Sequence, residues 1–389
     1  MATTRKGNKK TARSISGIST GVEGGNDSKR PHNISSASES NNNMDTTNNN
    51  DDNEDNNREL PTPAKLSKEL SKIVSDRYSR DESLRALKNL YTWALTQDVD
   101  FLKLFHIYAG IVRVVDFLNA TMNDIHCKGS IRMECIENAA DVIMLITFKG
   151  ENAINNEVAT KNVATLLDCD GVNTLIAASE EYTGGKAVPQ LKAVHSVWRA
   201  FTQISDSLMI QDTAITIFGT GIDIMSQLKS VDGDIASKTL EHVFHSLCGI
   251  VYHDRMTKKY FQDKNILPKC LEVFKKNGTW NFRSCEELIH KAVVFFNICR
   301  TKNLLDESSD YEMILPLLVV ALKKFPSNDK IRGHVVNFLN NACSSEANNK
   351  KTILRSGVME PLVLLLASDE INDENWKDKV RTLISKIIA

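Results

Sequence analysis

The 389-residue sequence has no long apolar run, no paired cysteines and no secretory leader. Its longest nearly apolar stretch, Met313–Leu322, is about half as long as a membrane-spanning helix, so we interpret it as a core helix and expect no membrane partner. The 8 cysteines include no Cys-x-x-Cys pair, and the N-terminus lacks the apolar segment of a signal peptide. These absences predict reduced thiols and a cytoplasmic or nuclear protein.

Charge of one sign is not in excess either. Lys and Arg together number 48 and Asp and Glu 49, which leaves a formal net charge of -1. A protein held mainly by nucleic-acid phosphates or by anionic lipid would carry a clear positive balance. We therefore do not expect nucleic acid as a partner, and the oligomeric state is open.

Catalytic signatures are also missing. Gly184-Gly185-Lys186 lacks the rest of a phosphate-binding loop, Gly219-Thr220-Gly221 lacks the third glycine of a dinucleotide turn, and no Gly-x-Ser-x-Gly elbow occurs. His242, His245 and Cys248 follow one another at three-residue spacing, which spreads them over about 120° of a helix. We expect no enzyme, no cofactor and no metal. A metal-dependent enzyme around His242/His245/His253 is an alternative.

The first 60 residues contain no aromatic residue and are rich in Ser, Gly, Asn and Asp. Such a composition cannot bury enough apolar surface to offset chain entropy, which predicts a disordered tail over residues 1–64 and a folded domain over 65–389. The basic start, Arg5–Arg13, is either a solubilising segment or a nuclear-localisation signal.

Beyond Pro63 the apolar residues follow a helical period. Three segments share apolar residues at i, i+4, i+7, i+8 and i+11. They are Leu240/Phe244/Leu247/Cys248/Val251, Leu288/Ala292/Phe295/Phe296/Cys299 and Ile331/Val335/Phe338/Leu339/Ala342. Strand signals are weak by comparison, so we predict an all-α domain.

A turn followed by an apolar helix start recurs along the chain. Its six positions are Gly110, Gly171, Gly221, Asn265, Glu312 and Gly357, at intervals of 61, 50, 44, 47 and 45 residues. The last three intervals match helical repeats of about 40 to 47 residues, which indicates a solenoid. We attribute the glycines to the turn between helices and Pro268, Pro316 and Pro361 to the first helical position.

The unit from Val335 to Ala367 resembles an armadillo repeat. It joins a helix ending in Leu339-Asn340-Asn341-Ala342 to an Asn349-Lys350 loop and then to the helix start Gly357–Pro361. The resemblance covers roughly residues 75–389 and implies a right-handed α-α superhelix of about six irregular repeats. HEAT-like helix pairs in the N-terminal half are an alternative.

In the armadillo family an asparagine on the third helix of each repeat bonds the backbone of an extended ligand in a concave groove. The resemblance carries this role to Asn89, Gln203, Asn297 and Asn341, with an uncertainty of one residue because the apolar pattern pairs Asn297 with Asn340. An amide offers both a donor and an acceptor to a peptide group. Alternatively, these amides bond neighbouring helix ends.

Four residues before these amides, peptide-carrying importins have Trp, where this sequence has Arg85, Arg199, Val293 and Asn337. Import cargo is therefore not expected. Arg85 and Arg199 favour an acidic ligand or are solvated helix residues. The acidic stretch Asp51–Asp55 is a candidate for binding in cis.

These patterns predict a non-enzymatic scaffold or adaptor that binds a peptide-like segment of another protein along the groove. The rival interpretation is a structural subunit that docks rigid neighbours through its convex face.

Overall fold

The structure is a computed structural model, and it describes residues 60–74, 77–150, 153–207, 211–253, 255–276, 279–280, 285–305, 309–345, 347–368 and 373–389. Helical structure begins at Pro63. The predicted disorder of the tail, Asp51–Asp55 and the basic start therefore lie outside the described residues.

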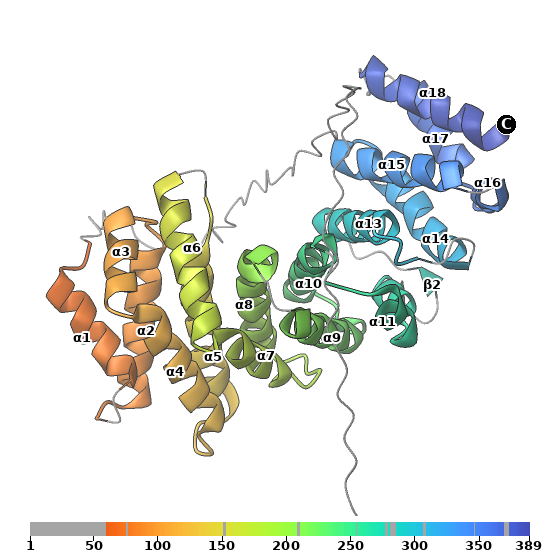
Figure 1. The fold of residues 1–389 in the computed structure, drawn as a ribbon. Helices are drawn as coiled ribbons and strands as arrows, with labels where there is room; N and C mark the ends of the chain where they lie inside the picture. The colour runs from red at the N-terminus through yellow and green to blue at the C-terminus, as the bar shows by residue number, and fades with distance from the viewer. Residues whose placement is uncertain are drawn as a thin grey trace, which may run out of the picture. The chain divides into compact units, whose positions relative to one another are not determined.

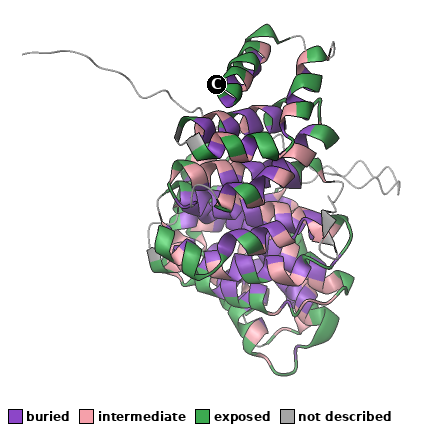
Figure 2. Cartoon of the chain, turned by 90° about the vertical axis from the view of Figure 1, so that its right-hand side faces the viewer, coloured by how far each residue is buried: buried purple, intermediate pink, exposed green. Residues whose placement is uncertain are grey.

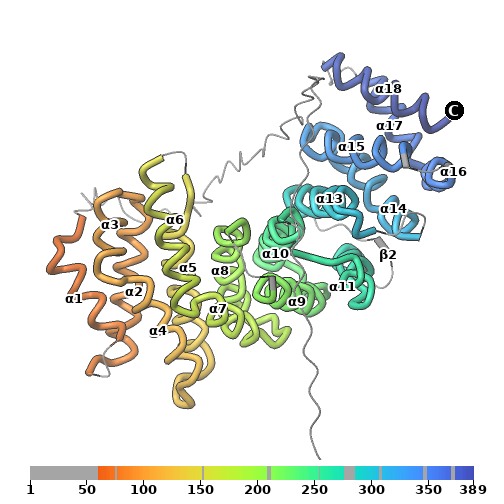
Figure 3. The backbone as a smooth tube through the Cα atoms, in the orientation of Figure 1, coloured from red at the N-terminus to blue at the C-terminus, as the bar shows by residue number. Residues whose placement is uncertain are grey.

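Seven helices of 15 to 19 residues form a ladder in which each packs against the next. We call it the third-helix ladder; its members are α2 (Arg80–Ala94), α5 (Gly129–Thr147), α8 (Val188–Ile204), α10 (Asp234–Tyr252), α13 (Glu286–Thr301), α15 (Asp329–Ser345) and α18 (Glu374–Ile388). Contacts link α2 to α5, α5 to α8 and so on to α18. Figures 1 and 3 trace these helices in chain order from red to blue.

A second ladder runs beside the first. It consists of α1 (Pro63–Val74), α4 (Gly110–Asn123), α7 (Gly171–Glu180), α9 (Gln211–Leu228), α12 (Ile266–Glu272), α14 (Ser309–Lys324) and α17 (Met359–Ala367), again each against the next. First helices precede some of these: α3 (Val99–Ile107), α6 (Ala153–Asp168), α11 (Lys258–Asp263) and α16 (Ala347–Arg355). The described residues thus form seven rungs, against about six expected.

The core lies between the two ladders, where the apolar stripes of the helices meet. All three predicted five-residue patterns are buried, and Phe244 of α10 meets Phe295 of α13 with ring centroids 5.7 Å apart. Figure 2 shows the buried residues where helices face one another and the exposed ones on outward surfaces. The predicted all-α solenoid is confirmed.

At the starts of α4 and α7 the recurring turn signal has a different physical basis from the one expected, whereas Gly357 does take a positive φ, of 78°. At the starts of α4 and α7 the positive φ belongs to Ala109 and Asp170, at 51° and 61°. The following glycines are needed for close packing, because a Cβ on Gly110 would lie 2.5 Å from the Phe105 ring and one on Gly171 would lie 2.3 Å from Leu166.

Two further expectations about turns are wrong. Gly221 lies inside α9, where a Cβ would come within 2.9 Å of the Trp198 ring, so this glycine marks a helix contact and no turn. Pro268 and Pro361 occupy the third position of their helices, and Pro316 lies within α14. Pro268 and Pro361 still remove no helical hydrogen bond, because the first four backbone amides of a helix have no intrahelical acceptor.

An irregularity falls where the sequence breaks its period. Between α12 and α13 the chain forms two short antiparallel strands, β1 (Lys275–Lys276) and β2 (Thr279–Trp280). The only other non-helical segments described are loops and the 3-10 turn η1 (Ser205–Ser207). None of the described helices is both long and apolar enough to cross a membrane.

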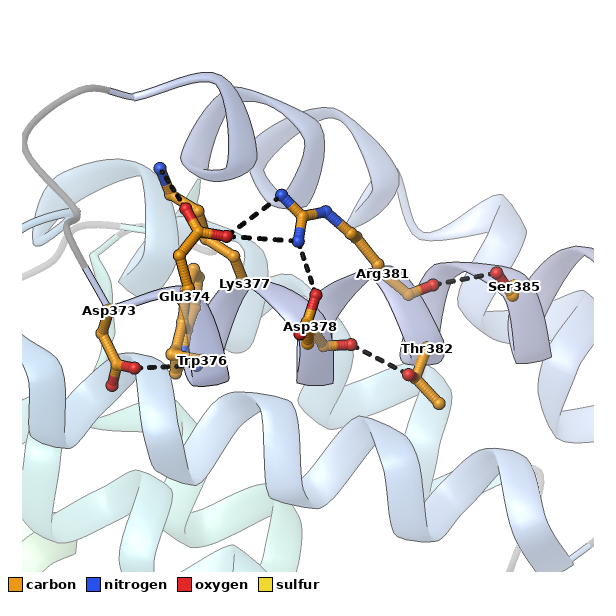
Figure 4. A network of polar contacts seen from close by, with 8 residues as sticks. All are labelled: Asp373, Glu374, Trp376, Lys377, Asp378, Arg381, Thr382 and Ser385. Atoms are coloured by element: carbon orange, nitrogen blue, oxygen red, sulfur yellow. Dashed lines mark hydrogen bonds and ion pairs between the residues drawn. The ribbon is translucent and has the colours of Figure 1, made fainter.

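The last rung ends in a polar helix. On α18, Glu374 pairs with Lys377 and Arg381, and Arg381 also pairs with Asp378 (Figure 4). The opposite side of α18 is buried through Trp376, Val380, Leu383 and Ile387. A polar outer side of this kind is typical of a capping repeat in a solenoid.

Candidate partner-binding face

All six predicted binding residues lie on the third-helix ladder, but on only four of its seven helices. Arg85 and Asn89 are on α2, Arg199 and Gln203 on α8, Asn297 on α13 and Asn341 on α15. The ladder brings them onto one series of packed helices, with α5 intervening between the first two pairs and α10 between Gln203 and Asn297.

The two residues on α2 are exposed and engage only near neighbours. Asn89 donates its side-chain amide to Glu69 Oε2 of α1 at 3.3 Å. Arg85 donates Nε to the carbonyl oxygen of Asp81, also at 3.3 Å, within its own helix. Both side chains can exchange these contacts for a ligand, because each is solvent-exposed.

The two residues on α8, Arg199 and Gln203, are less available to a ligand because they already have side-chain partners. Arg199 pairs with Asp141 of α5, with Nη1 3.4 Å from Oδ1. Burial raises the pKa of Asp141, and the Arg199 charge opposes that rise. Gln203 donates to Thr202 Oγ1 at 3.2 Å. Arg199 therefore already serves as the counter-ion of a buried carboxylate and does not match the exposed Arg85.

Burial defines the register of the amides. The buried pattern of α13 repeats in α15 with Phe295 and Phe296 matching Phe338 and Leu339, so Asn297 corresponds to Asn340. Asn340 and Asn341 are both part-exposed. Lys386 of α18 donates to Asn340 Oδ1 at 2.7 Å, whereas the backbone oxygen of Asn341 accepts from Arg300.

The row of amides is interrupted at α10. The same register places Gly249 at the position of Asn297, and a Cβ there would lie 2.6 Å from Asp206 Oδ1 and 2.8 Å from Ser205 Oγ of η1. At this rung the 3-10 turn occupies the space that an amide side chain would need.

A second set of polar side chains lies about two turns earlier on four of these helices and forms two ring pairs. It consists of one histidine from each of four consecutive third helices: His195 of α8, His242 of α10, His290 of α13 and His334 of α15. Ring centroids are 5.2 Å apart for His195 and His242 and 5.4 Å for His290 and His334. We call this set the histidine row.

Burial keeps most of these rings neutral at neutral pH. It lowers the pKa of His195 to about 3 and of His334 to about 4, and that of His242 well below its ordinary value. Nearby cations, chiefly Arg199 and Lys291, act in the same direction. The Nδ1 atom of His290 lies 3.3 Å from Glu287 Oε2.

Where complete, a rung holds a first, a second and a third helix, and each second and third helix packs against its counterpart in the next rung. The described chain is an armadillo-like solenoid. This assignment rests on the contacts within the chain itself.

No protein-family model and no curated protein matches the sequence. Among solved structures, an engineered protein is 16% identical with a TM-score of 0.48, over 83% of this chain and 78% of that one. Computationally designed armadillo repeat proteins for modular peptide recognition are 11% identical, with a TM-score of 0.41 over 82% and 99%. A designed armadillo repeat protein in complex with the peptide (KR)4 is 12% identical, with a TM-score of 0.40 over 83% and 99%.

The metal alternative finds no support in the solenoid. His242 belongs to the histidine row, and His245 lies one turn further along α10, whereas His253 lies beyond the end of that helix, 3.9 Å from Asp206. Within the described part of the chain, no three His, Cys, Asp or Glu side chains are grouped so that they could hold a metal ion.

The sequence contained a signal for the histidine row that grouping His242 with its chain neighbours concealed. Successive histidines of the row, His195, His242, His290 and His334, are separated by 47, 48 and 44 residues, close to the repeat period. Residues that recur near the repeat period lie close together on successive rungs. His334 lies one residue beyond the position that corresponds to His290, which Gly333 occupies.

Proposed function

We propose that this protein is a non-enzymatic adaptor that binds an extended segment of another protein along the outward side of the third-helix ladder. The observation that carries the proposal is the ladder itself, in which four of the seven helices present a polar amide that is at least partly exposed: Asn89 of α2, Gln203 of α8, Asn297 of α13 and Asn340 of α15. An extended strand advances about 3.3 Å per residue and packed helices lie about 8–10 Å apart, so each rung can meet two or three ligand residues.

Asn297 supports placing the ligand on the third-helix ladder. Its Oδ1 is buried without a hydrogen-bond partner, although the residue is part-exposed. An unsatisfied buried acceptor costs roughly 1–3 kcal/mol, and a donor from a bound segment would remove that cost. The proposal thus assigns ligand contact to Asn297 and Asn340, with Asn89, Gln203 and Asn341 on the same ladder.

We place this function in the cytoplasm or nucleus. All eight cysteines are free thiols, and six of them are buried. Persistent free thiols are typical of reducing compartments. The basic segment Arg5–Arg13 is compatible with a nuclear address, which a tail deletion followed by localisation would test.

The rival proposal is that partners dock on the second-helix ladder. Capture from native extract by the full chain distinguishes the two. We expect Asn297→Ala/Asn340→Ala to weaken retention of the main partner by about tenfold, because each lost hydrogen bond is worth about 0.5–1.5 kcal/mol.

The matched control is Thr216→Ala/Asp223→Ala, which truncates two exposed side chains on α9. It should leave capture unchanged. Loss with the α9 variant and none with the asparagine variant, both being folded, would favour the rival. A separate Asn341→Ala variant decides between the two registers.

A further inference from the structure

The histidine row is accompanied by cations along its whole length. Each of its four helices carries a lysine within four residues of the histidine: Lys192 on α8, Lys238 on α10, Lys291 on α13 and Lys330 on α15. Arg199 lies one turn after His195 on α8. As whole residues His195, His242 and His334 are part-exposed and His290 is 8% exposed, whereas Nδ1 of His242 is buried without a hydrogen-bond partner.

The electrostatic surroundings of the rings are positive. The groups that act on His195, His242, His245 and His334 are Arg199, Lys238, Lys291 and other imidazoles of the group, and all of them disfavour a further positive charge. Among the carboxylates, Glu287 faces His290 at 3.3 Å. The other carboxylates on α5, α10, α13 and α15 are Glu134, Glu137, Asp141, Asp234, Glu241, Glu286 and Asp329. Glu134 pairs with Lys88 and Asp329 with Arg332, and Glu286 accepts a hydrogen bond from Asn328.

Most of these carboxylates counter that potential only weakly. Burial raises the pKa of Glu137 and Asp141, and it raises the pKa of Glu241 to about 7. Asp234 is exposed and pairs with Lys238, with Oδ2 3.3 Å from Nζ. A ligand carboxylate would therefore meet cations and rings that can accept protons.

We propose that the histidine row, with Lys291, binds an acidic extended segment of a partner protein and takes up protons as it does so. The inference rests on the proposed adaptor function and names the chemistry of its ligand. A neutral imidazole offers one donor and one acceptor, and a carboxylate placed beside it favours the imidazolium, which donates from both nitrogens. Binding and protonation therefore reinforce each other.

The test uses the full chain and a fluorescent decapeptide of five Asp-Ser repeats, with five Asn-Ser repeats as the neutral control. Anisotropy titrations at pH 7.4 and 5.8, at one ionic strength, should show binding of the Asp peptide alone, at least threefold tighter at pH 5.8. Asp side chains ionise near pH 3.9, so the peptide keeps its charge at both pH values. Circular dichroism establishes that the protein is folded in each case.

Variants separate the row from general charge attraction. Lys291→Gln should weaken Asp-peptide binding about fivefold, whereas Lys351→Gln, on the exposed side of α16, should not. His242→Gln/His334→Gln should abolish the pH dependence, with His126→Gln, an exposed histidine, as control. Rescue by Lys291→Arg indicates that charge is what matters.

The proposal is overturned if the Asp peptide does not bind, if a Lys-Ser peptide binds in its place, or if Lys291→Gln and Lys351→Gln weaken binding equally. Such a result does not contradict the adaptor proposal, because that proposal is tested by the effect of Asn297→Ala/Asn340→Ala on partner capture. If, by contrast, Asn297→Ala/Asn340→Ala captures the partner as well as the wild type does, the adaptor proposal itself is wrong.

Discussion

Individual buried histidines make the stability of this solenoid sensitive to acid. Burial lowers the pKa of His195 and His245 to about 3 and that of His334 to about 4, from an ordinary value of 6.5. Below pH 6.5 the unfolded chain binds protons that the folded chain does not. Their contribution to stability is therefore complete above pH 6.5 and is lost as the pH falls toward 4.

We predict that His195→Gln/His334→Gln reduces the stability lost between pH 7.5 and 5.0 by about 2 kcal/mol or more, since one pKa unit corresponds to about 1.4 kcal/mol. Urea unfolding at the two pH values measures this difference. His126→Gln should retain the wild-type pH dependence, and an unchanged dependence in the double variant would show that these rings titrate normally.

Glu241 should behave in the opposite sense. Burial raises the pKa of its carboxyl to about 7, so the charged form weakens the fold as the pH rises through 7. We predict that Glu241→Gln stabilises the protein at pH 8.5 by roughly 1 kcal/mol and has little effect at pH 5. Equal effects at both pH values would mean that packing and not ionisation dominates.

Within the helices, two glycines offer the same substitution in different surroundings. Gly221 of α9 faces Trp198 at a Cβ distance of 2.9 Å, whereas a Cβ on Gly333 of α15 has nothing within 4 Å. Gly→Ala favours a helix interior by about 0.5–1 kcal/mol, but overpacking costs about 1–3 kcal/mol. Thermal unfolding should show that Gly221→Ala destabilises and Gly333→Ala stabilises.

The outer side of α18 should prevent rungs of two molecules from stacking. Arg381 and Asp378 are 53% and 72% exposed. We predict that Asp378→Leu/Arg381→Leu increases concentration-dependent association relative to the wild type, because an apolar terminal repeat exposes a surface that another rung can cover. Light scattering after size exclusion measures this. Asp100→Leu/Lys103→Leu on α3 is the control pair. Equal association of both variants would mean that any exposed apolar substitution promotes non-specific association.

At the scale of the molecule, the sequence predicts the class of fold and much of its core. The patterns around Phe244, Phe295 and Phe338 are buried as expected, because an apolar stripe of helical period has to face another helix. The handedness of the superhelix stays a prediction. Domain limits at 64/65 stay a prediction too, although α1 begins at Pro63.

The candidate site was less accessible to sequence reasoning. The choice between Asn340 and Asn341 depends on the register of α13 against α15, and the interruption at Gly249 depends on where η1 lies, which no local pattern encodes. The histidine row was readable in principle from its intervals. The spacing of His242, His245 and Cys248 along one helix does not indicate it, because its members lie about one repeat apart.

The central claim is that a partner lies along the third-helix ladder. A photo-crosslinking side chain at Asn337, exposed on α15, tests it directly against one at Asp223, exposed on α9 of the second-helix ladder. In native extract the account predicts a crosslinked partner from position 337 and none from 223, with loss of the crosslink in Asn297→Ala/Asn340→Ala. Crosslinking of the same partner from 223 alone would contradict the account and favour docking on the opposite ladder.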